Sequence, residues 1–139
     1  MKDFLSVLNA GLATTLVYIF GGLDVALQCL LVAIVIDYIT GLIKSYKNAN
    51  LNSKVGIKGL LKKVGILCLV ALTVVIDKLT GNTGYVRTMV IYYLVANEGL
   101  SILENLGEVG IIVPEFLKKR LEQLKETESD KKEKKWNIL

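Results

Sequence analysis

The 139-residue sequence has no histidine, one proline and two cysteines. Both cysteines, Cys29 and Cys68, lie inside apolar runs and lack the spacing of metal ligands, so we expect neither a disulfide framework nor a zinc site. The sequence also lacks a glycine-rich phosphate loop and a paired nucleophile and base. These absences leave little from which to build an active site. We therefore predict that the protein is not an enzyme and has no catalytic residue, metal or cofactor.

Long apolar runs are what the sequence does contain. Hydrophobic residues make up 53% of the chain, slightly above the share in ordinary soluble domains. Four runs have about the 17 to 25 residues with which a helix crosses roughly 30 Å of hydrocarbon. They cover residues 4–20, 23–43, 64–80 and 85–106. We predict an all-α, small polytopic membrane protein with three to four transmembrane helices in residues 1–113, followed by a second region.

The first run is the weakest candidate for a span, because it carries Asn9, Thr14 and Thr15. It can cross the membrane, form half of a re-entrant hairpin, lie at the interface, or be a cleaved signal peptide. The glycine pair at 21–22 suits a tight turn, and Asp24 is suited to cap the next helix.

Lysines gather between the second and third runs, in residues 44–63, where there is no acidic residue. By the positive-inside rule this loop is cytoplasmic, the short uncharged connection at 81–84 lies outside, and the carboxyl terminus is cytoplasmic. The lysines given this topology and membrane-surface role are Lys44, Lys47, Lys54, Lys58, Lys62 and Lys63. Basic residues border the apolar runs and are not interleaved with aromatics, so we expect a lipid bilayer, not nucleic acid, as the partner.

The region of residues 114–139 begins with a predicted amphipathic cytoplasmic helix. Leu117, Leu121 and Leu124 fall on one face of this helix. The helix can rest on the membrane surface or on the bundle, or associate with a copy of itself. We expect residues 128–139 to form a solvated, largely disordered tail. Its side chains suited to touch lipid headgroups are Trp136, Ile138 and Leu139.

Polar residues interrupt the apolar runs at helical spacing. Asp37 lies four residues from both Ala33 and Gly41, and small residues allow helices to approach closely in lipid. We therefore expect this row, and similar rows in the third and fourth runs, to face protein or water. The predicted pore-lining or helix-interface residues are Asp37, Gly41, Asp77, Asn97, Glu98, Ser101, Glu104 and Asn105.

Two of the acids have candidate basic partners at a similar predicted depth. Asp77 and Arg87 should pair near the outer surface, on neighbouring antiparallel helices. Glu104 should lie near the inner surface, within reach of Lys62 or Lys63. We interpret these pairs as structural.

Asp37 and Glu98 differ, because no basic residue lies between residues 3 and 43 or between 88 and 117. An uncompensated charge is costly in hydrocarbon, so these two acids need protons, water or each other. Several assembled copies would provide an aqueous path that a single small subunit cannot enclose. We therefore expect a homo-oligomer.

Three segments, taken in order, resemble the phage lysis and toxin-secretion holins of Gram-positive bacteria and their prophages. They are DYITG at 37–41, LNSKVGIKGLLKK at 51–63, and YYLVANEGLSILENLGEVGIIVP at 92–114. The resemblance runs from about residue 24 to residue 126, whereas residues 1–22 carry no comparable signature. The positions that carry it are Asp37, Gly41, Ser53, Gly59, Lys63, Asn97, Glu98, Ser101, Glu104, Asn105 and Pro114.

The resemblance implies a protein that accumulates in the cytoplasmic membrane of a bacterial host and oligomerises into lesions at a set time. A cytoplasmic endolysin then passes to the peptidoglycan, or in some relatives a large toxin is secreted. The deep acids would be tolerable in a quiescent cluster while neutral or paired, and favourable in water once a hole opens.

Two other functions remain open on the sequence. Four short helices with membrane acids are compatible with a small ion-coupled transporter or channel, which would not pass a folded enzyme. A membrane adaptor would instead recruit a soluble partner through residues 115–139 and would lose all function without them.

Overall fold

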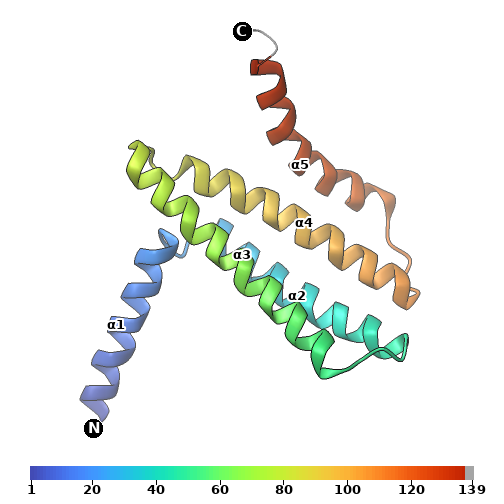
Figure 1. Ribbon diagram of the computed structural model, residues 1–139, viewed down its shortest axis with the longest axis horizontal. Coiled ribbons are helices and arrows are strands. Elements are labelled where there is room, and N and C mark those ends of the chain that lie inside the picture. Colours follow the sequence, from blue (N-terminus) through green and yellow to red (C-terminus); the bar gives the residue numbers. More distant parts are fainter. Residues whose placement is uncertain (137–139) are drawn as a thin grey trace.

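The computed structural model describes the backbone of residues 1–136 and the side chains of residues 1–125. Within that range the chain is all-α, as predicted (Figure 1). The helices are α1 (Lys2–Phe20), α2 (Val25–Lys47), α3 (Ser53–Thr80), α4 (Tyr85–Val109) and α5 (Glu115–Trp136). α2, α3 and α4 form a bundle in which α2 and α4 run parallel and pack most extensively, with α3 antiparallel to both. α1 projects from one end of this bundle.

The helix boundaries follow local capping chemistry. The Asp24 carboxylate accepts a hydrogen bond from the Leu27 backbone N–H at 3.0 Å, which confirms the predicted cap of α2. The Asn52 side chain accepts from the Val55 N–H at 3.0 Å and starts α3 in the same way. These side chains satisfy backbone donors that the first helical turn leaves unpaired.

The bundle has a small apolar core and a large apolar exterior. Leu30, Val70 and Ile91 are fully buried where α2, α3 and α4 meet. Many large apolar side chains, such as Val32 on α2 and Leu72 on α3, are exposed. An exterior of this kind is unfavourable in water and suits contact with lipid chains.

Three of the described helices, α1, α2 and α3, are long and apolar enough to cross a membrane. α1 is among them although its run was the weakest candidate, and α4 is not; how many helices cross the membrane stays a prediction. α4 carries charged side chains, yet Arg87 and Glu98 point inward and are buried. That α4 crosses the membrane beside α2 stays a prediction.

The predicted loop of residues 44–63 is wrong in its extent. α2 continues to Lys47 and α3 begins at Ser53, so the connection comprises only residues 48–52. Lys44 and Lys47 lie in the last turn of α2, where a cation interacts favourably with the helix dipole. The other four lysines of this group lie within α3 itself.

α5 rests on the bundle. A Cβ on Gly99 of α4 would come within 3.0 Å of the Leu121 side chain, so α5 approaches α4 closely at this point. The Lys125 ammonium donates to the Asn97 side-chain oxygen at 3.3 Å. The expectation of a disordered tail from residue 128 is wrong for the backbone, which is helical to Trp136. The predicted lipid contacts of Trp136, Ile138 and Leu139 lie outside the described side chains.

Candidate functional site

A cluster of three charged side chains lies at the centre of the bundle. Each of the helices α2, α3 and α4 provides one member, respectively Asp37, Lys63 and Glu98. The Lys63 ammonium donates to Asp37 Oδ2 and to Glu98 Oε2 and forms an ion pair with each. The exposed fractions of Asp37, Lys63 and Glu98 are 7%, 5% and 0%. We call these three residues the central cluster.

The central cluster corrects two expectations from the sequence. Lys63 was assigned to the membrane surface, and the two deep acids were expected to lack a basic partner. α3 begins eleven residues before the apolar run at 64–80, so Lys63 lies within the helix and inside the bundle. The position of Lys63 was visible in the sequence, because it lies three residues before Ile66 and seven before Val70, on the buried stripe of α3.

An amide network extends the central cluster towards the lysine-rich end of the bundle. Asn105 Nδ2 donates to Asp37 Oδ1 and to Thr40 Oγ1, both at 3.2 Å. Gly41 lies next to this amide, since a Cβ there would be 3.7 Å from Asn105 Nδ2. Both carboxylate oxygens of Asp37 therefore accept a hydrogen bond, Oδ2 from Lys63 and Oδ1 from Asn105.

Glu98 is less completely satisfied. Its Oε1 atom is buried and has no hydrogen-bond partner among the described residues. The central cluster also contains two acids and one base, so its charges do not balance if all three groups are ionised. Both features are costly in a medium of low dielectric constant. They distinguish the central cluster from a purely structural ion pair.

A pocket of about 250 Å³, lined by both polar and apolar side chains, adjoins the central cluster. Asp37 and Asn105 lie in its wall together with Ser101 of α4, and Lys44 and Lys62 lie towards the lysine-rich end. The volume holds several water molecules, and the lining offers them hydrogen-bond partners. The pocket thus gives Asp37 a polar route towards the end of the bundle where the lysines gather.

A second charged cluster, formed by Arg87, Asp24 and Asp77, lies at the opposite end of the bundle. The Arg87 guanidinium binds Asp24 with N–O distances of 2.7 and 3.1 Å. It also donates to the backbone carbonyls of Phe20 and Gly22, which flank the turn after α1. We call Arg87, Asp24 and Asp77 the outer cluster.

The predicted ion pair between Asp77 and Arg87 is not what the structure contains. The Asp77 carboxylate accepts from the backbone N–H groups of Val86 and Arg87, at 3.0 and 2.8 Å, and so caps the start of α4. The guanidinium of Arg87 turns to Asp24 instead. Its hydrogen bond to Asp24 is the main reason that the pKa of this carboxyl lies below the ordinary value of 3.8.

The remaining predicted residues lie nearer the surface. Glu104 is exposed and forms no ion pair with Lys62 or Lys63 in the described chain. Lys44 instead pairs with Glu108, at 2.8 Å, and Lys47 donates to the Glu108 backbone oxygen at 2.6 Å. The exposed lysines near the start of α3 are Lys54, Lys58 and Lys62.

Comparison with known proteins gives consistent matches. A model of the bacteriophage holin family matches residues 14–126, which include all of α2, α3 and α4. A "Probable holin" of Bacillus phage phi105 is 34% identical over 117 residues, covering 84% of this chain and 86% of the relative.

Bacterial relatives are similar over comparable lengths. An uncharacterized 14.9 kDa protein in the nagH 3′ region of Clostridium perfringens is 44% identical over 128 residues, which cover 89% of this chain and 97% of that protein. The uncharacterized protein YqxH of Bacillus subtilis strain 168 is 36% identical over 116 residues, with coverages of 84% and 82%. No solved structure gives a significant match.

Proposed function

Because the chain belongs to the bacteriophage holin family, we propose that it accumulates in the cytoplasmic membrane and assembles into lesions that release a cytoplasmic endolysin. The observation that carries this proposal is the family match over residues 14–126. That range contains the central cluster and the pocket that adjoins it. The family also points to a multi-pass membrane protein that is not an enzyme.

The distribution of lysines supports an orientation. Lys44 and Lys47 at the end of α2 and Lys54 and Lys58 at the start of α3 share one end of the bundle. By the positive-inside rule this end faces the cytoplasm, and α5 with the carboxyl terminus starts from the same end. In this orientation α4 crosses the membrane with Arg87 and Glu98 buried in the bundle and Glu104 and Glu108 near the cytoplasmic end.

The central cluster suits a subunit that exists in two environments. In a packed bundle Lys63 compensates Asp37 and Glu98, but one Glu98 oxygen remains without a partner. In a water-filled lesion all three groups would be hydrated, and this penalty would disappear. The cluster therefore favours the open assembly while the apolar core favours the closed subunit. The balance between them sets the delay before lysis.

The direct test is inducible expression in a bacterial host, with and without a co-expressed cytoplasmic endolysin. Culture density and membrane potential are followed over time. We expect delayed, abrupt lysis that needs both proteins, together with a sudden loss of membrane potential. A gradual loss of potential with the endolysin retained inside would contradict the proposal and support the ion-coupled transporter or channel.

Deletion of residues 115–139 separates a holin from an adaptor. α5 provides no member of the central cluster, although it contacts α4 at Asn97 and Gly99, on either side of Glu98. The shortened protein should therefore still permeabilise the membrane, with altered timing. Complete loss of lysis, at an equal amount of protein in the membrane, would support recruitment of a soluble partner. A matched control replaces only Lys125 by Gln, because that removes the charge contacting Asn97 and leaves α5 in place.

A further inference from the structure

α1 packs less on the bundle than the other apolar helices do, although Phe20 at its carboxyl end packs against the core. None of its residues is buried in the described chain, and its helix contact is with α3. Two glycines with positive φ, Gly21 at 74° and Gly22 at 116°, form the turn that directs it away from the bundle (Figure 1). Arg87 fixes this turn through the neighbouring carbonyls. The outward direction of α1 is thus specified by the structure.

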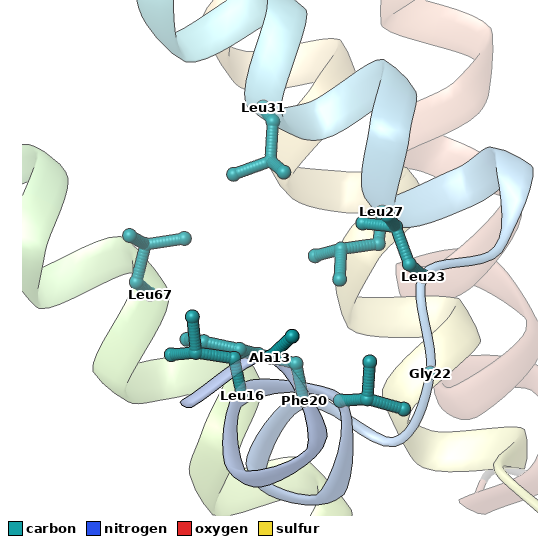
Figure 2. A pocket seen from close by; sticks show the side chains of 9 residues that line it. Ala13, Leu16, Phe20, Gly22, Leu23, Leu27, Leu31 and Leu67 are labelled. Atoms are coloured by element: carbon teal, nitrogen blue, oxygen red, sulfur yellow. The ribbon is translucent and has the colours of Figure 1, made fainter. Parts of the chain in front are cut away.

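One face of α1 borders an apolar pocket of about 340 Å³. Figure 2 shows Ala13, Leu16 and Phe20 of α1 across this pocket from Leu31 of α2 and Leu67 of α3. These α1 side chains are spaced by three or four residues and therefore share one helical face. Beyond the pocket, towards the start of α1, the same face continues and has no buried side chain among the described residues.

Asn9 lies on this face, four residues before Ala13. The hydroxyls of Ser6, Thr14 and Thr15 donate to backbone carbonyls of α1 itself, at 2.8 Å in each case. The Asn9 amide forms no hydrogen bond within the described residues. It lies ~16 Å along the helix from Phe20, well inside the hydrocarbon of a spanning helix. An amide at that depth is unfavourable unless it has a partner.

The subunit's own bundle offers no suitable partner. The wall of the pocket that faces α1 consists of apolar side chains, such as Leu27, Leu31 and Leu67. If α1 closed onto this wall, the Asn9 amide would be placed among leucines. A second copy of α1 is different, because an amide both donates and accepts and is therefore complementary to itself.

The spacing of the apolar residues fits such a pair. One seam of α1 has alternating steps of four and three residues, the repeat with which two helices pack along their length. Its members are Leu5, Asn9, Leu12, Leu16 and Ile19. All copies of α1 cross the membrane in one direction, so two seams meet in parallel and place Asn9 opposite Asn9. A single asparagine at such a position fixes the register of parallel helices.

We propose that α1 pairs in parallel with α1 of a second copy through this seam, with the two Asn9 amides hydrogen-bonded to each other. The inference rests on the proposed function, in which subunits assemble, and it identifies α1 as the helix through which two subunits first associate. The family match starts at residue 14, so Asn9 lies outside the matched region.

Cysteine cross-linking in isolated membranes tests the pairing without any endolysin. The background carries Cys29→Ala and Cys68→Ala. Leu12→Cys then places a thiol on the seam, and Thr14→Cys places one on the opposite face at similar depth. Full-length protein is expressed below the level that causes lysis, and disulfide-linked dimer is followed during oxidation. We expect Leu12→Cys to form dimer about five times faster than Thr14→Cys.

The Asn9 substitutions separate a specific pair from random collision. Adding Asn9→Leu should slow cross-linking at Leu12→Cys about fivefold, whereas Asn9→Gln, which keeps an amide, should preserve much of the rate. Equal rates at positions 12 and 14, or no effect of Asn9→Leu, would overturn the inference. An internal disulfide between Leu12→Cys and Leu67→Cys, formed in place of dimer, would overturn it by showing that α1 closes on its own bundle.

The inference and the proposed function fail in different ways. Seam-specific cross-linking without endolysin release would contradict only the holin function. Endolysin release with equal cross-linking at both positions would contradict only the pairing of α1.

Discussion

The outer cluster and the central cluster contain similar side chains but have different roles. In the outer cluster Arg87 is matched by Asp24, whose side chain is 50% exposed, and by two backbone carbonyls, so its hydrogen bonds are well satisfied. In the central cluster Glu98 is fully buried, and one of its oxygens has no partner among the described residues. A satisfied cluster at a helix terminus fixes a turn. A buried cluster with an unpaired oxygen makes the stability of the closed bundle depend on whether water can reach the cluster.

The largest effect should come from Lys63→Met. This change leaves Asp37 and Glu98 buried together without a cation, and breaking a buried ion pair costs about 3–5 kcal/mol. We expect the thermal unfolding midpoint in detergent to fall sharply and the protein to accumulate poorly. Lys62→Met is the matched control, since Lys62 is exposed and its loss should change stability by less than about 0.5 kcal/mol. Equal effects of the two changes would remove the distinction between the surface and the central cluster.

Arg87→Lys should have the next largest effect. A lysine cannot bind Asp24 through two nitrogens and also reach the carbonyls of Phe20 and Gly22. Hydrogen bonds to charged groups are worth about 1.5–3 kcal/mol each, and part of that range should be lost. The unfolding midpoint should fall, while the onset of lysis in surviving protein stays unchanged. A large change in lysis timing at unchanged stability would mean that the outer cluster also takes part in opening.

Glu98→Gln should act in the opposite direction on the central cluster. The amide removes the excess negative charge of the central cluster and still accepts a hydrogen bond from Lys63. We expect the closed bundle to gain about 1 kcal/mol and lysis to be delayed at equal expression. Asp37→Asn leaves Glu98 as the single acid beside Lys63 and should also shift the time of lysis. Unchanged timing in both variants would count against a role for the cluster.

The smallest expected effect is a dependence on pH at the outer cluster. Arg87 lowers the pKa of Asp24 in the folded protein, so this interaction contributes stability above pH 3.8 and is lost as the pH falls through the lowered pKa. Unfolding midpoints measured downward from about pH 5 should fall less steeply in Asp24→Asn than in the unchanged protein. Parallel curves would show that the pair contributes no pH-dependent stability.

The apolar and charged positions of the sequence predicted much of the fold, because each helix face carries side chains suited to the medium that it contacts. The four apolar runs, the cap at Asp24 and an amphipathic helix after residue 114 all correspond to helices in the structure. The start of α3 was not predicted. Hydropathy marks where the apolar part of a helix begins, and the helical backbone hydrogen bonds can begin earlier. Ser53 starts that helix well before its apolar part.

The partners of the charged residues were harder to predict than the helices. Asp77 was predicted to pair with Arg87 because both lie at a similar predicted depth in the membrane. A carboxylate near the start of a helix can also accept from backbone N–H groups, and Asp77 does so. Lys63 was assigned to the membrane surface because it lies in the lysine-rich, acid-free stretch of residues 44–63. The helical period places Lys63, and not Lys62, on the face of α3 that carries Ile66 and Val70. Which acids this face meets follows from the packing of the whole bundle.

The central claim is that the environment of the central cluster changes from buried to fully hydrated when lesions form. Thr40→Cys, in the background lacking both native cysteines, reports on this directly, because Thr40 is buried and hydrogen-bonded to Asn105. Reaction with a small membrane-permeant maleimide, which modifies only hydrated thiols, is followed through the onset of lesion formation. Ser53→Cys, exposed at the start of α3, should react throughout, and lipid-facing Val32→Cys should stay unreactive. We predict that Thr40→Cys is unreactive before onset and reacts afterwards; release of endolysin while Thr40→Cys remains unreactive would contradict the account.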